Sequence, residues 1–317
     1  MVTAIAAAAW PRCSSPAKSL LEDTVPSTPD LPEWTYDAIQ RAGMPADGKI
    51  SWLNQPQHEA DAWVLRCGMT VVKFHASHID PEALRTRLSI VSDCLGQYWL
   101  SPLLPDPLIS PWERLVTLWP YRQTLTPGQQ EPWEQAGRLL ANLHNTPTLG
   151  RTIPHTGLDR LRRAVDVATA SDFFPDWLAA RGQSVLQADR PNPDPRWVHG
   201  DFHLGQLARD LDGQWTLIDP DDLGLGDPAW DLARPAALWA VGLLDDQSWT
   251  QFINAYRQAN GPAIPEHGNP WPALDLPARA AAIIMCVQET LRDPQSPASQ
   301  TLLEACRLMK IPAIASK

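Results

Sequence analysis

The sequence predicts an α+β protein of two unequal lobes, with a small, strand-rich N-terminal lobe and a larger, mainly helical C-terminal lobe. β-branched and other apolar residues fill two short runs, 62–75 and 114–121, as is typical of strands. From residue 131 onward the apolar residues recur at helical spacing instead. Strands gathered at the front of a chain and helices at its rear favour two parts that pack separately.

The lobes are expected to span residues 31–121 and 122–317, after a flexible leader over residues 1–30. The leader is rich in Ser, Thr and Ala and carries four prolines, a composition that buries too little apolar surface to order itself. Its apolar run, Ala4–Ala9, is short and has no positive charge ahead of it, so we do not expect a signal peptide.

The N-terminal lobe is expected to begin its sheet with a hairpin. The runs AWVLRC and TVVKFH flank Gly68-Met69, and glycine at the first turn position suits a type II′ turn. Lys73 falls on the second of these strands. The run RLVTLWPY forms a further strand that ends at Pro120.

Helices follow each part of the sheet. Residues 81–95 predict a helix that Asp80 caps and Pro81 begins. Residues 131–145 predict another, because five apolar residues share one face: Trp133, Ala136, Leu139, Leu140 and Leu143. A largely helical stretch to about residue 190 and more helices after 245 complete the C-terminal lobe.

Composition limits the partners. The formal net charge of −10 argues against a nucleic-acid binder, which usually presents a basic patch. No uncharged apolar stretch approaches the length of a membrane span, so no membrane partner is expected. The five cysteines are scattered and form no C-x-x-C pair, which favours neither a disulfide framework nor a thiolate zinc site and suggests a cytoplasmic protein.

Chemistry-bearing residues concentrate between residues 197 and 233. Asp212-Gly213 predicts a two-residue hairpin turn, whose register sets Gln206 opposite Asp219. An amide oxygen and a carboxylate at that spacing suit Mg²⁺, which takes hard oxygen ligands and keeps water and phosphate as the others. Asp201 precedes the hairpin, where it could orient a hydroxyl and accept its proton.

A helix should begin just after this hairpin. Asp227 is an acidic N-cap residue, and Pro228 follows it at the first helical position. The segment between the hairpin and this helix is therefore a short loop, DPDDLGLGD.

The runs HGDFHLGQ and IDPDDLGLGDPAWDLA resemble the aminoglycoside phosphotransferase and choline kinase superfamily, which has a protein-kinase-like fold. Its members show HGDxxxxN, then I-D-x-x-D-x-x-x-G-D-P-x-x-D-L-A, at the spacing found here. The resemblance extends over roughly residues 45–260. It implies a small-molecule kinase that uses ATP or GTP with Mg²⁺ and phosphorylates a hydroxyl of a small-molecule acceptor.

The resemblance also assigns roles to single residues. Asp201 matches the catalytic aspartate, and Asp219 matches the metal-binding aspartate. Gln206 stands where the family usually has Asn, and the HxGQ pattern resembles the maltokinase branch. Lys73 matches the strand lysine that holds the α- and β-phosphates. Asp227 matches the acidic residue that braces the catalytic loop, although a helix N-cap explains it equally well and is the interpretation we favour.

The rest of the nucleotide site follows less directly. Trp119 and Tyr121 lie in the predicted strand and hinge between the lobes, where Trp119 is placed near the adenine. Glu82 is the acidic residue available to pair with Lys73. The turn where the family carries a glycine-rich phosphate loop reads NQPQHEAD here, with no glycine.

Two other interpretations remain open. His199, Asp201 and His203 could form a metallohydrolase site, although in a kinase the two histidines would shape the loop through hydrogen bonds. The missing glycines and Gln206 also allow a nucleotide-binding pseudokinase or interaction module.

The acceptor is predicted to be a neutral or cationic polyol, such as a sugar, an amino sugar or an aminoglycoside-like compound. Asp221, Asp222 and Asp231 could bind its hydroxyl or ammonium groups and repel an anion. The alternative is that these acids are exposed loop carboxylates.

Overall fold

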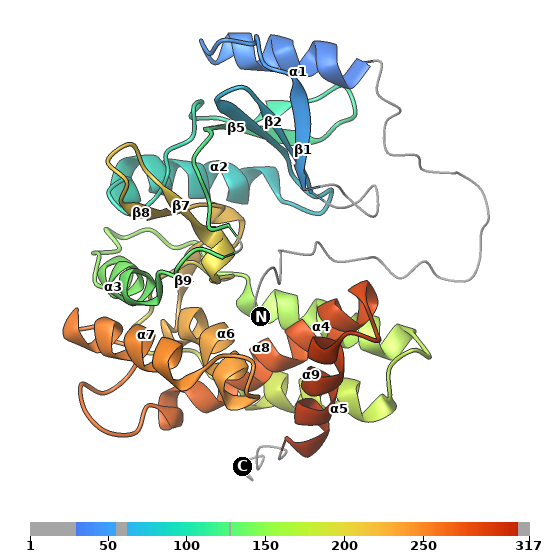
Figure 1. Cartoon of the computed structure of the whole chain (residues 1–317), viewed down its shortest axis with the longest axis vertical. Coiled ribbons are helices and arrows are strands. Elements are labelled where there is room, and N and C mark those ends of the chain that lie inside the picture. The colour runs from blue at the N-terminus through green and yellow to red at the C-terminus, as the bar shows by residue number, and fades with distance from the viewer. Residues whose placement is uncertain (1–29, 55–61, 127, 310–317) are drawn as a thin grey trace. The chain divides into compact units, whose positions relative to one another are not determined.

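The computed structural model describes residues 30–54, 62–126 and 128–309, and these fall into two compact units. The strand unit holds the described residues up to Thr124 together with Ala208–Asp221. The helical unit holds Leu125–Leu207 together with the described residues from Asp222 onward (Figure 1). The chain thus passes from the strand unit at Thr124, three residues beyond the predicted Tyr121, and returns to it for residues 208–221. The leader predicted over 1–30 lies outside the described residues, except for Asp30.

The strand unit contains an antiparallel five-stranded sheet in the order β1-β2-β3-β5-β4. Its strands are β1 (Ile50–Asn54), β2 (Trp63–Cys67), β3 (Thr70–Phe74), β4 (Leu108–Ile109) and β5 (Leu115–Pro120). The predicted hairpin is confirmed: Cys67 pairs with Thr70, and Gly68 takes the positive φ of +56° that the tight turn needs.

Two helices cover opposite faces of this sheet (Figure 1). Helix α1 (Asp30–Arg41) packs Ala38 and Ile39 on the side chains of alternate strand residues, among them Trp63 and Phe74. Helix α2 (Pro81–Ile90) packs Leu84 and Leu88 on the other face. The Asp80 carboxylate accepts the Ala83 N–H at 2.7 Å, which confirms the predicted cap, and the last turn widens into a π-helical segment, Val91–Leu95.

The second hairpin joins β7 (Leu207–Arg209) to β8 (Trp215–Leu217), with a register that differs from the predicted one. The Asp210 N–H donates to the Gln214 carbonyl at 2.8 Å, so the turn has three residues and ends on Gly213, whose φ is +77°. The Asp210 carboxylate causes this shift by accepting the N–H groups of Asp212 and Gln214. The predicted pairing of Gln206 with Asp219 is therefore wrong by one residue.

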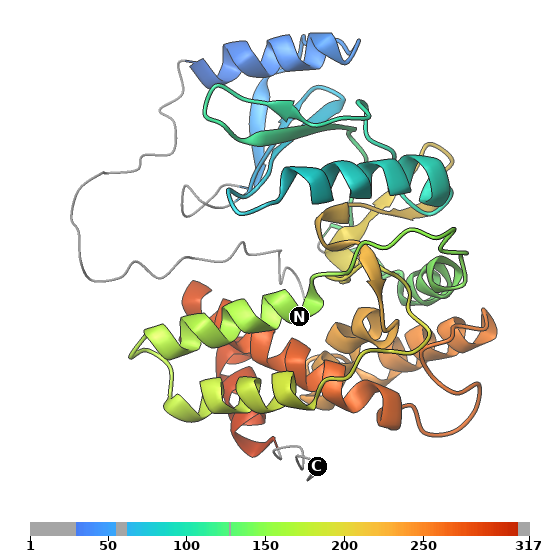
Figure 2. The same ribbon diagram turned by 180° about the vertical axis from the view of Figure 1, so that it is seen from behind.

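The helical unit is built from seven described helices and one small sheet. The helices are α3 (Trp133–His144), α4 (Gly157–Ala170), α5 (Asp176–Ala188), α6 (Ala229–Ala240), α7 (Asp246–Gln258), α8 (Trp271–Arg292) and α9 (Pro297–Leu308). Strands β6 (Arg196–Val198) and β9 (Gly224–Gly226) form the sheet. Helix α4 lies beside α5 and α8, as Figure 2 shows from behind.

Close approach of α3 and α7 depends on a glycine. A Cβ atom built on Gly137 would lie 2.3 Å from the Phe252 carbonyl oxygen, so a larger residue would push the helices apart. This contact fixes α3, which supplies one of the buried side chains of the site. Within the described residues, no helix is both long enough and apolar enough to cross a membrane.

Candidate active site

The loop that follows β6 carries Asp201 and is held by a buried carboxylate on α6. Asp231 accepts the His199 N–H at 2.7 Å and the Gly200 N–H at 2.9 Å. Gly200 has a φ of +85°, and a Cβ atom there would lie 2.4 Å from the Asp222 carbonyl oxygen. The loop therefore needs glycine at this position, immediately before Asp201.

Asp231 is in turn fixed from α3 and α7. The His144 ring contacts its carboxylate through Nε2 at 3.0 Å and the Tyr256 hydroxyl through Nδ1 at 2.8 Å. Burial acts to raise the pKa of Asp231, but the hydrogen bond and charge of His144 hold it below its ordinary value. Asp231 is fully buried, so it is not the exposed loop carboxylate allowed for in the prediction.

Asp227, by contrast, serves the start of α6. Its carboxylate accepts the Ala229 N–H at 2.9 Å, and the helix begins at Ala229, one residue later than predicted. The predicted N-cap position is therefore off by one residue: Pro228 occupies it, and Asp227 satisfies the N–H group of the first helical residue from one position earlier. The acidic residue that braces the Asp201 loop is Asp231.

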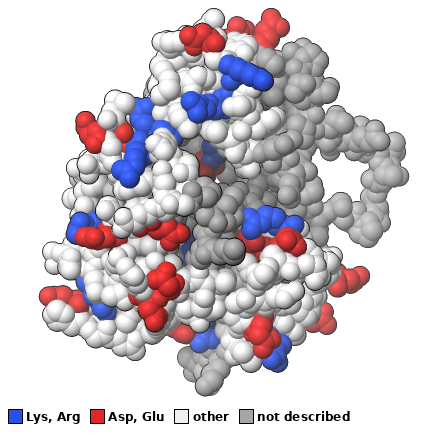
Figure 3. Space-filling view, in the orientation of Figure 1, with Lys and Arg blue, Asp and Glu red and all other residues white. Residues whose placement is uncertain are grey.

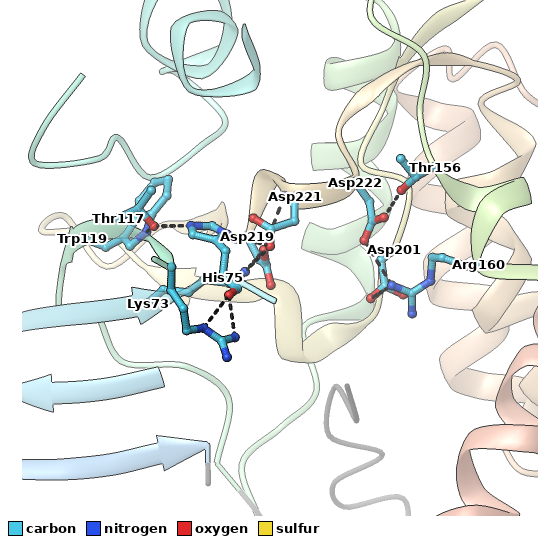
Figure 4. Close-up of polar contacts among 11 residues, drawn as sticks. Lys73, His75, Thr117, Trp119, Thr156, Arg160, Asp201, Asp219, Asp221 and Asp222 are labelled. Carbon is cyan, nitrogen blue, oxygen red and sulfur yellow. Dashed lines mark hydrogen bonds and ion pairs between the residues drawn. The ribbon is translucent and has the colours of Figure 1, made fainter. Parts of the chain in front are cut away.

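Asp201 lies between two arginines of the helical unit. Its Oδ2 atom is 2.9 Å from Arg160 Nη1 on α4, and its Oδ1 atom is 3.5 Å from Arg234 Nη2 on α6. Burial acts to raise the pKa of Asp201, but Arg160 and Arg234 together hold it below its ordinary value. Arg160 also contacts Asp222 at 3.1 Å, and Thr156 donates its hydroxyl to the same carboxylate (Figure 4).

The two histidines of the loop make local contacts. His199 is buried, with its Nδ1 atom 3.4 Å from the Asp201 N–H and its ring packed edge-on to Phe202. His203 accepts the Gly205 N–H at 3.0 Å, and burial together with Arg234 lowers the pKa of His203 to about 3. Both rings thus face backbone groups of the loop, in keeping with a shaping role.

In the strand unit, Lys73 on β3 is paired with two aspartates that follow β8. Lys73 Nζ lies 2.5 Å from Asp219 Oδ1 and 2.9 Å from Asp221 Oδ2. Burial acts to lower the pKa of Lys73, but the charges of Asp219 and Asp221 raise it above its ordinary value. His75 contacts the same Asp221 oxygen at 3.0 Å and the Thr117 hydroxyl at 2.8 Å (Figure 4).

Asp219 has an unusual backbone. Its φ is +62°, a left-handed conformation that costs a non-glycine residue of order 1–3 kcal/mol and that concentrates at functional sites. Asp221 beside it has a buried Oδ1 atom with no hydrogen-bond partner among the described residues. Burial acts to raise the pKa of Asp221, but His75 and Lys73 hold it well below its ordinary value, so this unpartnered oxygen is charged.

The predicted pairing of Glu82 with Lys73 is wrong. The Glu82 side chain is 82% exposed and pairs with Arg85 on the next turn of α2. An arginine one turn further along the same helix is a ready partner for an acidic residue. Forming this local ion pair costs less side-chain conformational entropy than reaching a partner on a distant element. Asp219 and Asp221 hold Lys73 instead.

The hinge residues also differ from expectation. Trp119 is 7% exposed, packs on Leu84 and Leu88, and donates its indole N–H to Thr117 at 2.8 Å. Its ring belongs to the core of the strand unit and offers no open face to an adenine. Tyr121 donates its backbone N–H to Met69 at 2.7 Å, and the Arg66 guanidinium lies 3.5 Å from the centre of its ring.

Gln206 lies in a 3₁₀ turn, Leu204–Gln206, just before the chain passes from the helical unit to the strand unit. It is 4% exposed. In the strand unit, the Asp219 carboxylate and the unpartnered Asp221 oxygen are hard oxygen donors of the kind that Mg²⁺ prefers. Within the described ranges, no three His, Cys, Asp or Glu side chains gather as a metal-binding cluster, so the metallohydrolase interpretation gains no support. The glycine-free turn at 54–61 lies outside the described residues, apart from Asn54.

The candidate site lies in a segment that matches a known protein family. The model of the phosphotransferase enzyme family matches residues 108–274, which contain Asp201, Asp219 and Asp231. No curated protein matches the chain.

Solved structures share the fold over most of its length. Choline kinase LicA from Streptococcus pneumoniae has a TM-score of 0.61 at 12% identity, over 88% of this chain and 98% of that one. LicA in complex with AMP gives 0.58 at 12% identity, over 87% and 97%. The GDP complex of a variant aminoglycoside 2'-phosphotransferase-IIIa gives 0.54 at 15% identity, over 87% and 96%. The predicted α+β, two-lobed, kinase-like fold is confirmed.

Proposed function

Because the chain belongs to the phosphotransferase enzyme family, we propose that it transfers the γ-phosphoryl group of ATP or GTP to a hydroxyl group of a small molecule. Asp201 is the catalytic carboxylate of this reaction. The observation that carries the proposal is the way Asp231 holds the loop: a buried, charged residue fixes two backbone N–H groups directly before Asp201. Such support is typical of a side chain whose position matters for chemistry.

Asp201 acts on the acceptor. Its carboxylate orients the hydroxyl and takes its proton as the oxygen attacks phosphorus. The bond between the γ-phosphorus and the β-γ bridging oxygen breaks, and a new bond forms between phosphorus and the acceptor oxygen. The nucleoside diphosphate leaves, and the proton passes from Asp201 to solvent.

Lys73, Asp219 and Asp221 belong to the nucleotide side of the reaction. The Lys73 ammonium group binds the α- and β-phosphates, exchanging a carboxylate contact for a phosphate one. Asp219, with Gln206, would hold Mg²⁺, which neutralises the charge on the phosphates when it is bound. Support comes from the AMP complex of LicA and the GDP complex of the aminoglycoside enzyme, which share the fold.

The acceptor is a polyol of sugar-like size.

The reaction is expected to take place in the cytoplasm, where nucleotide triphosphates are abundant. Four cysteines are free thiols, which suits this reducing compartment: Cys67, Cys94, Cys286 and Cys306. Acidic and basic side chains are interspersed over the described part of the face in Figure 3, consistent with small-molecule partners and not with nucleic acid.

A nucleotide-consumption screen tests the proposal. ATP and GTP are offered with sugars, amino sugars, sugar acids, aminoglycosides, choline-like alcohols and hydroxy amino acids, and diphosphate release is measured. We expect acceptor-dependent turnover that the Asp201→Asn variant lacks. Nucleotide binding without turnover across all acceptors would contradict the proposal and indicate a pseudokinase.

A further inference from the structure

Several arginine side chains gather around Asp201 in the helical unit. Arg160 and Arg234 converge on its carboxylate from α4 and α6 (Arg160 is drawn in Figure 4). Their side chains are only 12% and 10% exposed. Arg163, one turn along α4 from Arg160, adds a third guanidinium group whose charge acts on Asp222 and Asp201.

The carboxylates near these three arginines are shared among them or paired elsewhere. Asp201 and Asp222 both act on Arg160, Arg163 and Arg234. Asp159 also acts on Arg163, but it forms its own ion pair with Arg162. Glu289 also acts on Arg234, but it forms its own ion pair with Arg292. His203 is uncharged at neutral pH, because burial lowers its pKa to about 3. Among the described residues, the Asp201 and Asp222 carboxylates are thus shared by several guanidinium groups and do not belong to Arg234 alone.

Arg234 shows where that charge is directed. Its Nη1 atom is buried and has no hydrogen-bond partner among the described residues. The guanidinium group contacts Asp201 only through Nη2, at 3.5 Å, which is longer than a good charge-assisted hydrogen bond. A buried, charged donor left unsatisfied is unfavourable, so a ligand anion that reached it would be strongly held.

The acids expected to bind a cationic acceptor are all engaged. Asp231 holds the backbone of the Asp201 loop, and Asp222 is paired with Arg160 and Thr156. Asp221 is paired with Lys73 and His75 in the strand unit. An ammonium group near Asp201 would face arginines instead, so the predicted preference for a cationic acceptor loses its basis.

We propose that the acceptor is a polyhydroxy carboxylate, such as a sugar acid, whose carboxylate binds Arg234 and Arg160 while its hydroxyl faces Asp201. This inference rests on the proposed function and specifies its substrate. Asp201 shares this site and repels a phosphate ester, which carries close to two negative charges, more strongly than a carboxylate, which carries one. A carboxylate also fits the planar guanidinium group through two parallel hydrogen bonds.

Binding of this anion would also make Asp201 a better proton acceptor. In the described state the two arginines stabilise the ionised form of Asp201 and weaken it as a proton acceptor. A substrate carboxylate that takes over their hydrogen bonds leaves Asp201 free to accept the hydroxyl proton. The reaction itself is balanced as before: the acceptor oxygen gains the phosphoryl group, the nucleoside diphosphate leaves, and the proton passes through Asp201 to solvent.

A charge-matched acceptor series tests the inference. Gluconate and glucuronate are compared with glucose, glucosamine and glucose 6-phosphate, and kcat/KM is measured from diphosphate release. We expect the best carboxylate to exceed its neutral counterpart by about 100-fold or more, because the neutral compound leaves Arg234 unsatisfied. A neutral, cationic or phosphorylated acceptor used at least as well, with turnover still dependent on Asp201, would overturn the inference and leave the proposed function intact.

Arginine variants identify the group that binds the anion. Arg234→Gln should raise KM for the carboxylate acceptor by at least about 10-fold and leave KM for the nucleotide unchanged, and Arg234→Lys should recover part of the loss. Arg162→Gln, on the same helix as Arg160 but 56% exposed, is the matched control and should change neither constant. A rise in the nucleotide KM alone would show that Arg234 serves the γ-phosphate and would contradict the inference.

Discussion

The Asp201 centre of the helical unit and the Lys73 centre of the strand unit are built with opposite charge balance. At the first, one carboxylate lies between two guanidinium groups. At the second, one ammonium group lies between two carboxylates, with His75 also on Asp221. Buried polar atoms without a partner in the described chain include a donor on Arg234 at the first centre and an acceptor on Asp221 at the second. The first is therefore suited to an anion and the second to a cation, as a sugar acid and Mg²⁺ would require.

Removing a carboxylate from the Lys73 centre should have the largest effect on nucleotide binding. Asp219→Asn keeps the shape of the side chain but halves the negative charge facing Lys73, so Mg²⁺-dependent nucleotide binding should weaken and kcat should fall by about 100-fold or more. Calorimetric titration of nucleotide with and without Mg²⁺ measures the binding. Unchanged Mg²⁺ dependence would break the assignment of this centre to the cation.

The buried support of the Asp201 centre can be separated from its helix cap. Asp231→Ala should destabilise the protein by about 3–5 kcal/mol, because it leaves the Nε2 atom of His144 and two backbone N–H groups buried without a partner. Asp227→Ala, which removes only the contact to Ala229, should cost about 1 kcal/mol. Urea unfolding of both variants measures the difference, and equal losses would contradict the bracing role of Asp231.

The positive surroundings of Asp201 should also appear in the pH dependence of stability. The pKa of His203 is lowered from 6.5 to about 3, so between these values the unfolded chain binds a proton that the folded one does not. Stability should therefore fall as pH drops through this window, by up to about 1.4 kcal/mol per pH unit, and level off below it.

His203→Gln should flatten this slope in unfolding experiments at a series of pH values. His267→Gln provides the control, because the His267 side chain is 89% exposed. If stability depends on pH in the same way in His203→Gln, groups other than His203 cause that dependence.

The smallest effect is expected at Glu82. Glu82→Gln should change the nucleotide KM by less than about twofold and stability by less than about 1 kcal/mol, because an exposed ion pair contributes little. Steady-state kinetics at saturating acceptor measures the first quantity. A large rise in the nucleotide KM would show that Glu82 does replace one of the aspartates on Lys73.

Features set by neighbouring residues were predictable from the sequence. The β2–β3 hairpin follows from Gly68-Met69, and the start of α2 follows from the Asp80 cap. The positions of Asp201 and Asp219 follow from the spacing of the two motifs. The hairpin register was mispredicted because the Asp210 side chain selects a longer turn than Asp212-Gly213 suggests.

Features set by distant contacts were not predictable. The role of Asp231 depends on His144, which lies 87 residues earlier in the chain on another helix. Arg234 directly follows the second motif, and nothing in its neighbours shows that its guanidinium group reaches Asp201. The predicted contact of Trp119 with an adenine fails for the same reason, because its ring packs on Leu84 and Leu88 of a distant helix.

The central claim is that Asp201 accepts the proton of the acceptor hydroxyl during phosphoryl transfer. Transfer of label from a γ-labelled nucleotide to the best acceptor of the screen tests it most directly, in the native protein and in Asp201→Asn. We expect the variant to lose about 10²–10⁴-fold in kcat while its KM for the nucleotide stays nearly unchanged. Substantial transfer by Asp201→Asn, or a loss that appears only in nucleotide binding, would contradict it.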